Sequence, residues 1–175
     1  MQTWIGFLRA INVGKRKYLM ADLRAAMSAA GFTDVETHIQ TGNVRFSTPL
    51  TDREEVSAQV ESVLLADRGF EVPVVLLTPE ELRSLAVEGL GLSADLEPDA
   101  HYIAVAAAEV GPEACAELGN DHEHLIVSSR AVHWLLSDRA FHESKISLPK
   151  LEKAIGTATV RNLKVIYALS EKWGR

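Results

Sequence analysis

Residues 3–77 alternate between strand-type and helix-type apolar patterns, and the order of these patterns restricts the fold more than any other feature of the sequence. A nearly continuous apolar run predicts a first strand at 3–9, because a strand covered on both faces has no polar side. Further patterns predict a helix at 19–30, a hairpin with strands near 35–39 and 43–46, a helix from Asp52 to Gly69, and a strand at 72–77. The order is therefore strand, helix, strand, strand, helix, strand.

This order matches an α+β ferredoxin-like plait (βαββαβ), in which the first and third strands are central and the second and fourth are edges. Pro73 agrees with it, since proline cannot donate to a sheet ladder and belongs in an edge strand. The topology brings the loop 9–17 and the hairpin turn 40–43 to the same end of the sheet. Because neighbouring strands lie about 4.8 Å apart, we expect Arg9 and Asn43 to lie within side-chain reach.

The second half of the chain predicts a smaller α+β unit. We place a first subdomain at 1–78, a connecting helix and linker at 79–100, and a second subdomain at 101–175. The linker rests on the glycine, serine and proline residues of 89–100. The second subdomain is expected to contain a strand at 101–108, a short helix at 112–118, a hairpin over 125–136, a helix from Ser147 to Gly156, and a last helix capped by Thr159. Its order corresponds to an incomplete plait-like βαββ unit followed by C-terminal helices.

Composition excludes several classes of protein. With 175 residues, 47% of them hydrophobic, the chain can bury a substantial core. No apolar run approaches the roughly 20 residues that cross a bilayer, and the N-terminal residues lack a signal-like pattern, so we expect no membrane partner and a cytoplasmic location. The single cysteine, Cys115, excludes an internal disulfide and agrees with a reducing compartment. No cofactor motif is present.

The stretch 9–17, RAINVGKRK, holds four of the 18 Lys and Arg residues of a chain whose formal net charge is -6. We call it the basic loop. A strand end, Gly14-Lys15 and a following helix start form a pattern that favours anions. The pattern is not a Walker motif, because Arg9 stands where its first glycine belongs and no serine or threonine follows Lys15. A solvated loop that binds nothing is an equal alternative.

Other candidate residues carry weaker signals. Arg161 and Asn162 are expected in the first turn of the last helix, where the helix dipole opposes a cation, so a bound anion or a salt bridge must compensate. Lys145 is a further candidate cation. His122 and His124 share one side of a strand but have no identifiable third metal ligand, so no metal site is predicted. Cys115 has no cationic neighbour in sequence, which indicates packing and not a nucleophile.

The chain resembles a bacterial family described as domain of unknown function 1697. The resemblance lies in RAINVGKRKYLMAD at 9–22 and HIQTGNVRF at 38–46, and it extends to Ser144-Lys145, 151–156 and 159–162. It implies a ferredoxin-like first part, a related second part and a small cytoplasmic protein, and it implies no activity. The sequence departs from the family pattern at four positions, with Ala10 in place of glycine, His38 of tyrosine, Thr41 of serine and Leu163 of tryptophan.

The function favoured by these features is binding of a small anionic, phosphorylated or nucleotide-like ligand at the rim formed by the basic loop and the turn 40–43. The residues predicted to bind it are Arg9, Asn12, Gly14, Lys15, Gln40, Thr41, Gly42, Asn43, Lys145, Arg161 and Asn162. Single-stranded RNA binding is an alternative, since plait sheets often serve it, although the expected ring motif is missing. A structural or protein-interaction role is the other alternative. No catalytic residue is identified, and the oligomeric state is left open.

Overall fold

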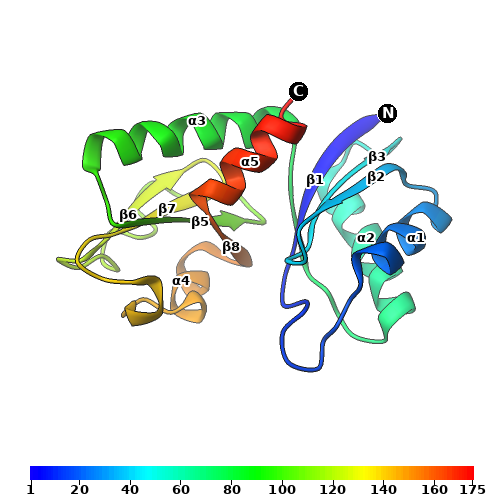
Figure 1. Ribbon diagram of the computed structural model, residues 1–175, viewed down its shortest axis with the longest axis horizontal. Coiled ribbons are helices and arrows are strands. Elements are labelled where there is room, and N and C mark those ends of the chain that lie inside the picture. Colours follow the sequence, from blue (N-terminus) through cyan, green and yellow to red (C-terminus); the bar gives the residue numbers. More distant parts are fainter. The chain divides into compact units, whose positions relative to one another are not determined.

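The computed structural model describes residues 1–175 and contains two four-stranded antiparallel sheets with five α-helices (Figure 1). The chain divides into two units, Met1–Glu80 and Glu81–Arg175, and each sheet belongs to one of them. The fold is therefore mixed α and β, as the sequence predicts.

Unit 1 follows the order predicted from its apolar patterns. Its elements are β1 (Gln2–Leu8), α1 (Met20–Ala29), β2 (Thr33–His38), β3 (Asn43–Thr48), α2 (Arg53–Arg68) and β4 (Val74–Leu77). The strands lie in the order β2-β3-β1-β4. The predicted central position of the first and third strands is confirmed, and so is the edge position of the fourth. Pro73, predicted to lie within that strand, comes directly before it, because β4 begins at Val74.

Local signals set the ends of the two helices of unit 1. The Asp52 carboxylate accepts a hydrogen bond from the Glu55 N–H at 2.9 Å, which caps α2, and Gly69 ends that helix in the left-handed conformation. After α1, Gly31 has a φ of 96° and the Phe32 N–H donates to the Met27 carbonyl at 3.1 Å. The chain thereby leaves each helix in the direction of its next strand.

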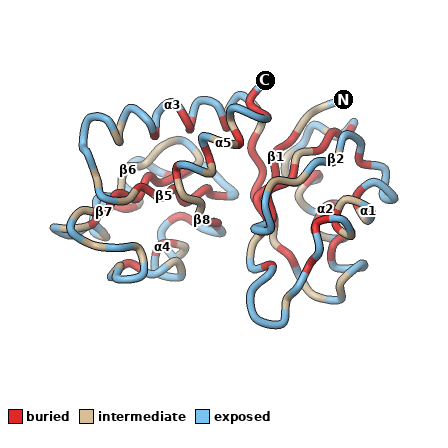
Figure 2. Tube along the Cα trace, in the orientation of Figure 1, coloured by how far each residue is buried: buried red, intermediate tan, exposed pale blue.

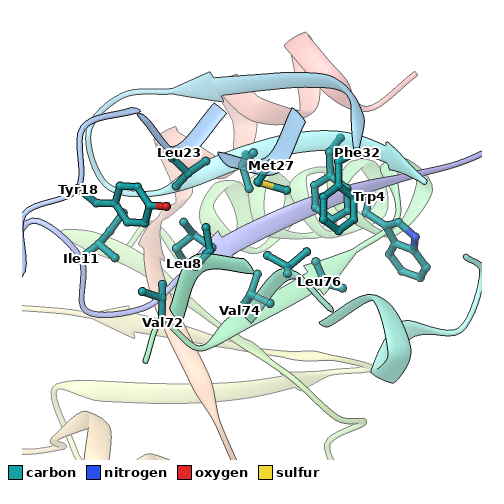
Figure 3. Close-up of a cluster of buried hydrophobic side chains, with 14 of the residues drawn as sticks. Trp4, Leu8, Ile11, Tyr18, Leu23, Met27, Phe32, Val72, Val74 and Leu76 are labelled. Carbon is teal, nitrogen blue, oxygen red and sulfur yellow. The ribbon is translucent and has the colours of Figure 1, made fainter. Parts of the chain in front are cut away.

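One hydrophobic core joins the sheet of unit 1 to its two helices (Figure 3). Trp4 and Leu8 of β1 belong to the same cluster as Leu23 and Met27 of α1, and all four side chains are buried. Figure 2 shows β1, β3 and β4 largely buried, whereas β2 and much of the basic loop are more exposed. The core thus fixes the end of β1 from which the basic loop departs.

Unit 2 is built around a second sheet of the same size. Its elements are α3 (Pro79–Leu96), β5 (Ala100–Ala106), β6 (Glu123–Ser128), β7 (Ala131–Leu136), a 3₁₀ turn (Phe141–Glu143), α4 (Leu148–Ile155), β8 (Ala158–Asn162) and α5 (Leu163–Trp173). The strand order is β6-β7-β5-β8. Trp134, Leu136 and Leu151 belong to the core between this sheet and α4, and α3 and α5 lie over the other face (Figure 1).

Three expectations for the second half are corrected. The predicted incomplete sheet is complete, because residues 158–162 form β8 and pair with β5, so Thr159 lies in a strand and caps no helix. The expected short helix at 112–118 consists of turns. The predicted linker at 89–100 is helical up to Leu96, where α3 ends.

Gly89 lies inside α3, although glycine often ends a helix, and close packing accounts for its presence there. A Cβ added at this position would lie 2.6 Å from Leu163 Cδ1 and 3.4 Å from His133 Cε1. The glycine therefore allows α3 to approach α5 and the sheet closely, and it does not end the helix.

Candidate functional site

The basic loop and the turn 40–43 meet at one end of the sheet of unit 1, as the topology predicts. Phe7 pairs with Asn43 across β1 and β3, and the Leu8 N–H donates to the Gly42 carbonyl at 2.8 Å. Gly42 has a φ of 82°, and a Cβ there would lie 2.8 Å from Leu8 Cβ and 2.7 Å from Ile11 Cδ1. The close approach of the two segments therefore requires glycine at this position.

Asn12 ties the two segments together through its side chain. Its Nδ2 donates to the Gln40 carbonyl at 2.6 Å, and its Oδ1 accepts from the Tyr18 N–H at 2.9 Å. Tyr18 is itself buried, and its hydroxyl donates to Asp67 Oδ2 at 2.7 Å. The position of the basic loop is therefore fixed from the turn 40–43 on one side and from α2 on the other.

Asn43 organises the turn from within. Its side chain is completely buried, and its Nδ2 donates to the His38 carbonyl at 3.1 Å and to Thr41 Oγ1 at 3.0 Å. These hydrogen bonds satisfy the side-chain amide of Asn43, which has no access to water at the start of the central strand β3. Asn12 and Asn43 thus shape the rim by donating to the carbonyls of Gln40 and His38, which also agrees with a purely structural role for both residues.

The backbone of the basic loop alternates in handedness. Ala10, Asn12 and Gly14 have positive φ values of 54°, 55° and 56°. Where right-handed and left-handed helical residues alternate, successive N–H groups turn toward one side and form a concave arrangement that holds anions in many proteins. In the basic loop, Val13 also pairs with Arg16 in a short antiparallel bridge. Within the loop, the Asn12 N–H is occupied by the Arg16 carbonyl, and the Arg16 N–H by the Val13 carbonyl.

The cations of the basic loop differ in their surroundings. Arg16 lies with its guanidinium carbon 4.5 Å from the centre of the Phe70 ring and donates to the carbonyls of Ala10 and Glu71. Lys15 and Lys17 are exposed and form no ion pair. The loop contains no acidic residue, so these two ammonium groups leave an uncompensated positive charge at the rim.

The other three predicted ligand residues belong to unit 2. Arg161 lies in β8, where its Nη1 donates to Thr159 Oγ1 at 2.8 Å, and burial lowers the pKa of its guanidinium to about 10. Asn162 is the cap of α5 and accepts from the Lys164 N–H at 2.8 Å. The expectation that both lie in the first turn of the last helix is wrong, and the expected conflict between a cation and the helix dipole disappears with it.

The sequence interpretation missed Glu123, whose side chain accepts a hydrogen bond from the backbone N–H of Lys145. The carboxylate of Glu123 is fully buried and accepts hydrogen bonds from Asn120, Trp134, Arg139, Ser144 and the Lys145 N–H. Burial alone would raise the pKa of Glu123, but these donors hold it at about 2. The carboxylate organises the loops on one side of unit 2, and only the neighbouring Ser144-Lys145 motif gave a sign of it.

A second missed group is a chain of buried side chains between α3 and the sheet of unit 2. Ser93 Oγ lies 2.7 Å from His101 Nδ1, and His101 Nε2 lies 2.9 Å from His133 Nδ1. Burial and the proximity of His133 lower the pKa of His101 to about 4, and burial also lowers the pKa of His133. Both rings are therefore neutral at pH 7.

The surroundings of His133 determine which atoms donate in the hydrogen bonds that link Ser93, His101 and His133. His133 Nε2 is buried without a hydrogen-bond partner and lies 3.6 Å from Glu88 Oε2. A proton on this nitrogen faces the carboxylate favourably, whereas a lone pair would be repelled by it. His133 Nδ1 is then an acceptor, His101 Nε2 a donor, and Ser93 donates to His101 Nδ1.

The remaining candidates have ordinary surroundings. Cys115 is buried, and burial raises the pKa of its thiol, as expected of a packed cysteine. His122 is hydrogen bonded through Nδ1 to the Ser137 carbonyl at 3.1 Å. No group of three or more His, Cys, Asp or Glu residues is arranged to hold a metal ion. None of the helices has the length and apolar character needed to cross a bilayer.

Comparison with known proteins identifies the family and supports the fold. A conserved bacterial protein from Streptococcus pneumoniae has a similar structure, with a TM-score of 0.76 and 19% sequence identity over 100% of this chain and 99% of that chain. No curated protein matches the sequence. The family model for the protein of unknown function DUF1697 matches residues 1–133, so the chain belongs to the DUF1697 family.

Proposed function

We propose that unit 1 binds a small anionic ligand, phosphorylated or nucleotide-like, at the rim formed by the basic loop and the turn 40–43. We also propose that unit 1 is a ferredoxin-like plait and that the protein acts in the cytoplasm. The divisions near residues 78 and 101 are proposed to separate a first subdomain, a connecting segment and a second subdomain. The ligand-binding proposal depends on one observation. Ala10, Asn12 and Gly14 have positive φ in a loop whose exposed lysines have no acidic partner.

The proposed residues have different roles at this rim. The loop N–H groups around Gly14 and the Lys15 ammonium contact the anion, because an anion is stabilised most by charge-assisted hydrogen bonds. Arg9 supplies further positive charge from the end of β1. Asn12 and Asn43 are positioning residues, since their side chains already bond to Gln40 and to His38.

Gly42 lets the turn approach the loop, and Gln40 and Thr41 border the rim. Lys145, Arg161 and Asn162 lie in unit 2, where Asn162 and the backbone of Lys145 make the local bonds described above. The proposal therefore requires only the residues of unit 1.

Neither alternative gains a specific supporting observation. Single-stranded RNA would need exposed rings on the sheet, but Trp4, Phe7 and Phe46 are each less than 5% exposed. A role without any ligand agrees with the bonds of Asn12 and Asn43, yet it gives no reason for unpaired lysines in a loop with three residues of positive φ.

The test is a titration of the ¹⁵N-labelled full chain with inorganic phosphate and with nucleoside mono-, di- and triphosphates, followed by amide chemical shifts. We expect saturable shifts confined to residues 9–17 and 40–43 for at least one ligand. The double variant Lys15→Ala, Lys17→Ala should bind that ligand about tenfold more weakly. The matched control, Lys164→Ala with Lys172→Ala, removes the same charge from α5 and should bind normally.

Two results would overturn the proposal. One is the absence of any saturable shift at ligand concentrations of about 10 mM, well above the dissociation constants of weak complexes. The other is equal weakening by both double variants, because binding would then reflect net charge and not the rim.

A further inference from the structure

Each sheet of this protein ends in two edge strands, and an unprotected edge is a template for pairing with another strand. In β4, the outward N–H of Val74 donates to Glu61 Oε1 at 2.9 Å. In β8, the N–H of Ala158 donates to Glu152 Oε1 at 3.0 Å. One outward N–H of each of these two edges is thus occupied by a carboxylate of the adjacent helix.

The edge strand β2 is protected in another way. A bulge interrupts its pairing between Thr33 and Glu36, and Asp34 inside that bulge has a φ of 51°. Bulges and charged side chains prevent a flat approach of a further strand. Three of the four edges therefore carry a side-chain bond or a bulge that hinders strand addition.

β6 is the fourth edge strand (Figure 1). Its pairing with β7 has no bulge, and no side chain bonds to its outward backbone groups. The N–H and C=O groups of Glu123 point away from β7 and bond to Asn120. In an antiparallel pair, every second residue points outward in this way, so the backbone groups of Leu125 and Val127 point in the same direction. These groups have no hydrogen-bond partner. The strand from 124 to 128 contains no proline, lysine or arginine, and its Leu-Ile-Val run is partly exposed.

A cavity of about 650 Å³ lies along this edge. Its lining includes His124 and Ile126, which point to one face of the sheet, and Glu123 and Leu125, which point to the other. The cavity therefore runs around the edge, beside Leu96 at the end of α3. An added strand would find space there for its side chains.

The charge around the cavity is mainly negative, although Arg139 and the backbone of Lys145 bond to Glu123 in its lining. No lysine or arginine occurs between Arg83 and Arg130 in the sequence. Exposed carboxylates adjoin the lining residues at Asp95, Glu97, Asp99, Glu113, Glu117 and Asp121. Glu123 adds little to this charge, because Arg139 pairs with it at 3.0 Å.

We propose that the β6 edge and its cavity bind an extended peptide segment with alternating basic and apolar residues, which adds to the sheet as a fifth strand. The main chain of the segment bonds to Leu125 and Val127, its apolar side chains enter the cavity, and its cations meet the carboxylates. A second copy of this chain fits less well, because pairing of two β6 edges would bring the same acidic surfaces together.

The test uses blocked synthetic peptides of about ten residues, the length of a long strand. One alternates lysine and valine, a second alternates glutamate and valine, and a third is the lysine peptide with a central proline. We expect the full-length protein to bind the first, measured by calorimetry, and to bind the other two at least about tenfold more weakly. Amide hydrogen exchange at Leu125 and Val127 should slow in the complex.

Variants of β6 make the test specific to the edge. Val127→Pro removes an N–H that does not take part in the β6–β7 ladder, so it should leave the sheet intact and weaken binding of the lysine peptide about tenfold. Val127→Ala keeps the N–H and should bind nearly as well as the original protein. Circular dichroism checks that both variants fold.

The proposal fails if the lysine and glutamate peptides bind equally, or if neither binds. It also fails if the protected amides lie outside β6. A dimer in sedimentation experiments, with Leu125 and Val127 already protected in the absence of peptide, would show that a second copy occupies the edge. If Val127→Pro does not fold, slowed exchange at these two amides in the original protein decides the question by itself.

Discussion

Replacement of Glu123 by glutamine tests whether one buried carboxylate holds the loops of unit 2. Its pKa is about 2, compared with an ordinary value of 4.5. Because one pKa unit corresponds to about 1.36 kcal/mol, the ionised carboxylate contributes about 3 kcal/mol to the free energy of unfolding. Glutamine keeps the shape but turns an NH₂ group toward donors such as Trp134 Nε1, which then lack an acceptor. We expect Glu123→Gln to lose about 3 kcal/mol of stability at pH 7.

The pH dependence of this loss follows from the direction of the shift. The folded-state pKa lies below the unfolded one, so the contribution is complete above pH 4.5 and disappears as the pH falls toward about 2. Urea unfolding of both proteins, followed by tryptophan fluorescence between these pH values, should therefore show curves that converge in acid. Glu117→Gln is the control, because this exposed carboxylate lies in the same loop region. Equal stability of Glu123→Gln and the original protein at pH 7, or a difference that persists near pH 2, would refute the reasoning.

Three further predictions concern stability. The pKa of His101 is about 4 in the folded protein, compared with an ordinary value of 6.5, so on acidification the unfolded chain takes up this proton before the folded protein does. The free energy of unfolding should therefore fall by about 3 kcal/mol between pH 6.5 and 4. His101→Gln should flatten this part of the pH profile in urea unfolding. Gly42→Ala should cost about 1 to 3 kcal/mol from backbone strain and contact with β1, whereas Gly14→Ala, with open space around it, should cost less in the same measurement. Tyr18→Phe removes the bond to Asp67 and should lower the thermal midpoint by an amount equivalent to about 2 kcal/mol.

The elements that could be predicted are those whose signals are local. Asp52 and Gly69 carry the start and end of α2 in their own chemistry, and Pro73 excludes the following strand from the centre of a sheet. The meeting of the basic loop with the turn 40–43 was also predictable, because antiparallel pairing of β1 and β3 requires it. At this rim, the sequence indicated which residues converge, although it assigned to Asn12 and Asn43 a ligand contact where the structure has bonds within the protein.

The elements that were missed depend on partners distant in sequence. β8 has only five residues and resembles a helix start, and its pairing with β5 overrides that local preference. Gly89 resembles a terminator, and only the proximity of Leu163 shows that it serves close packing. Apart from Asn120, the donors around Glu123 are at least 11 residues away in sequence, so no local pattern marked this carboxylate as buried.

The sequence by itself determined the α+β class, the order of the strands in unit 1 and the convergence of two polar segments at one end of its sheet, because each of these follows from hydrophobic periodicity and chain direction. Tertiary structure alone decided which polar groups are buried and which edge of which sheet is left open. The burial of Glu123, His101 and His133 and the unpaired backbone of β6 exist only after distant segments have packed together, since desolvation and hydrogen bonding across a sheet depend on neighbours that no local pattern specifies.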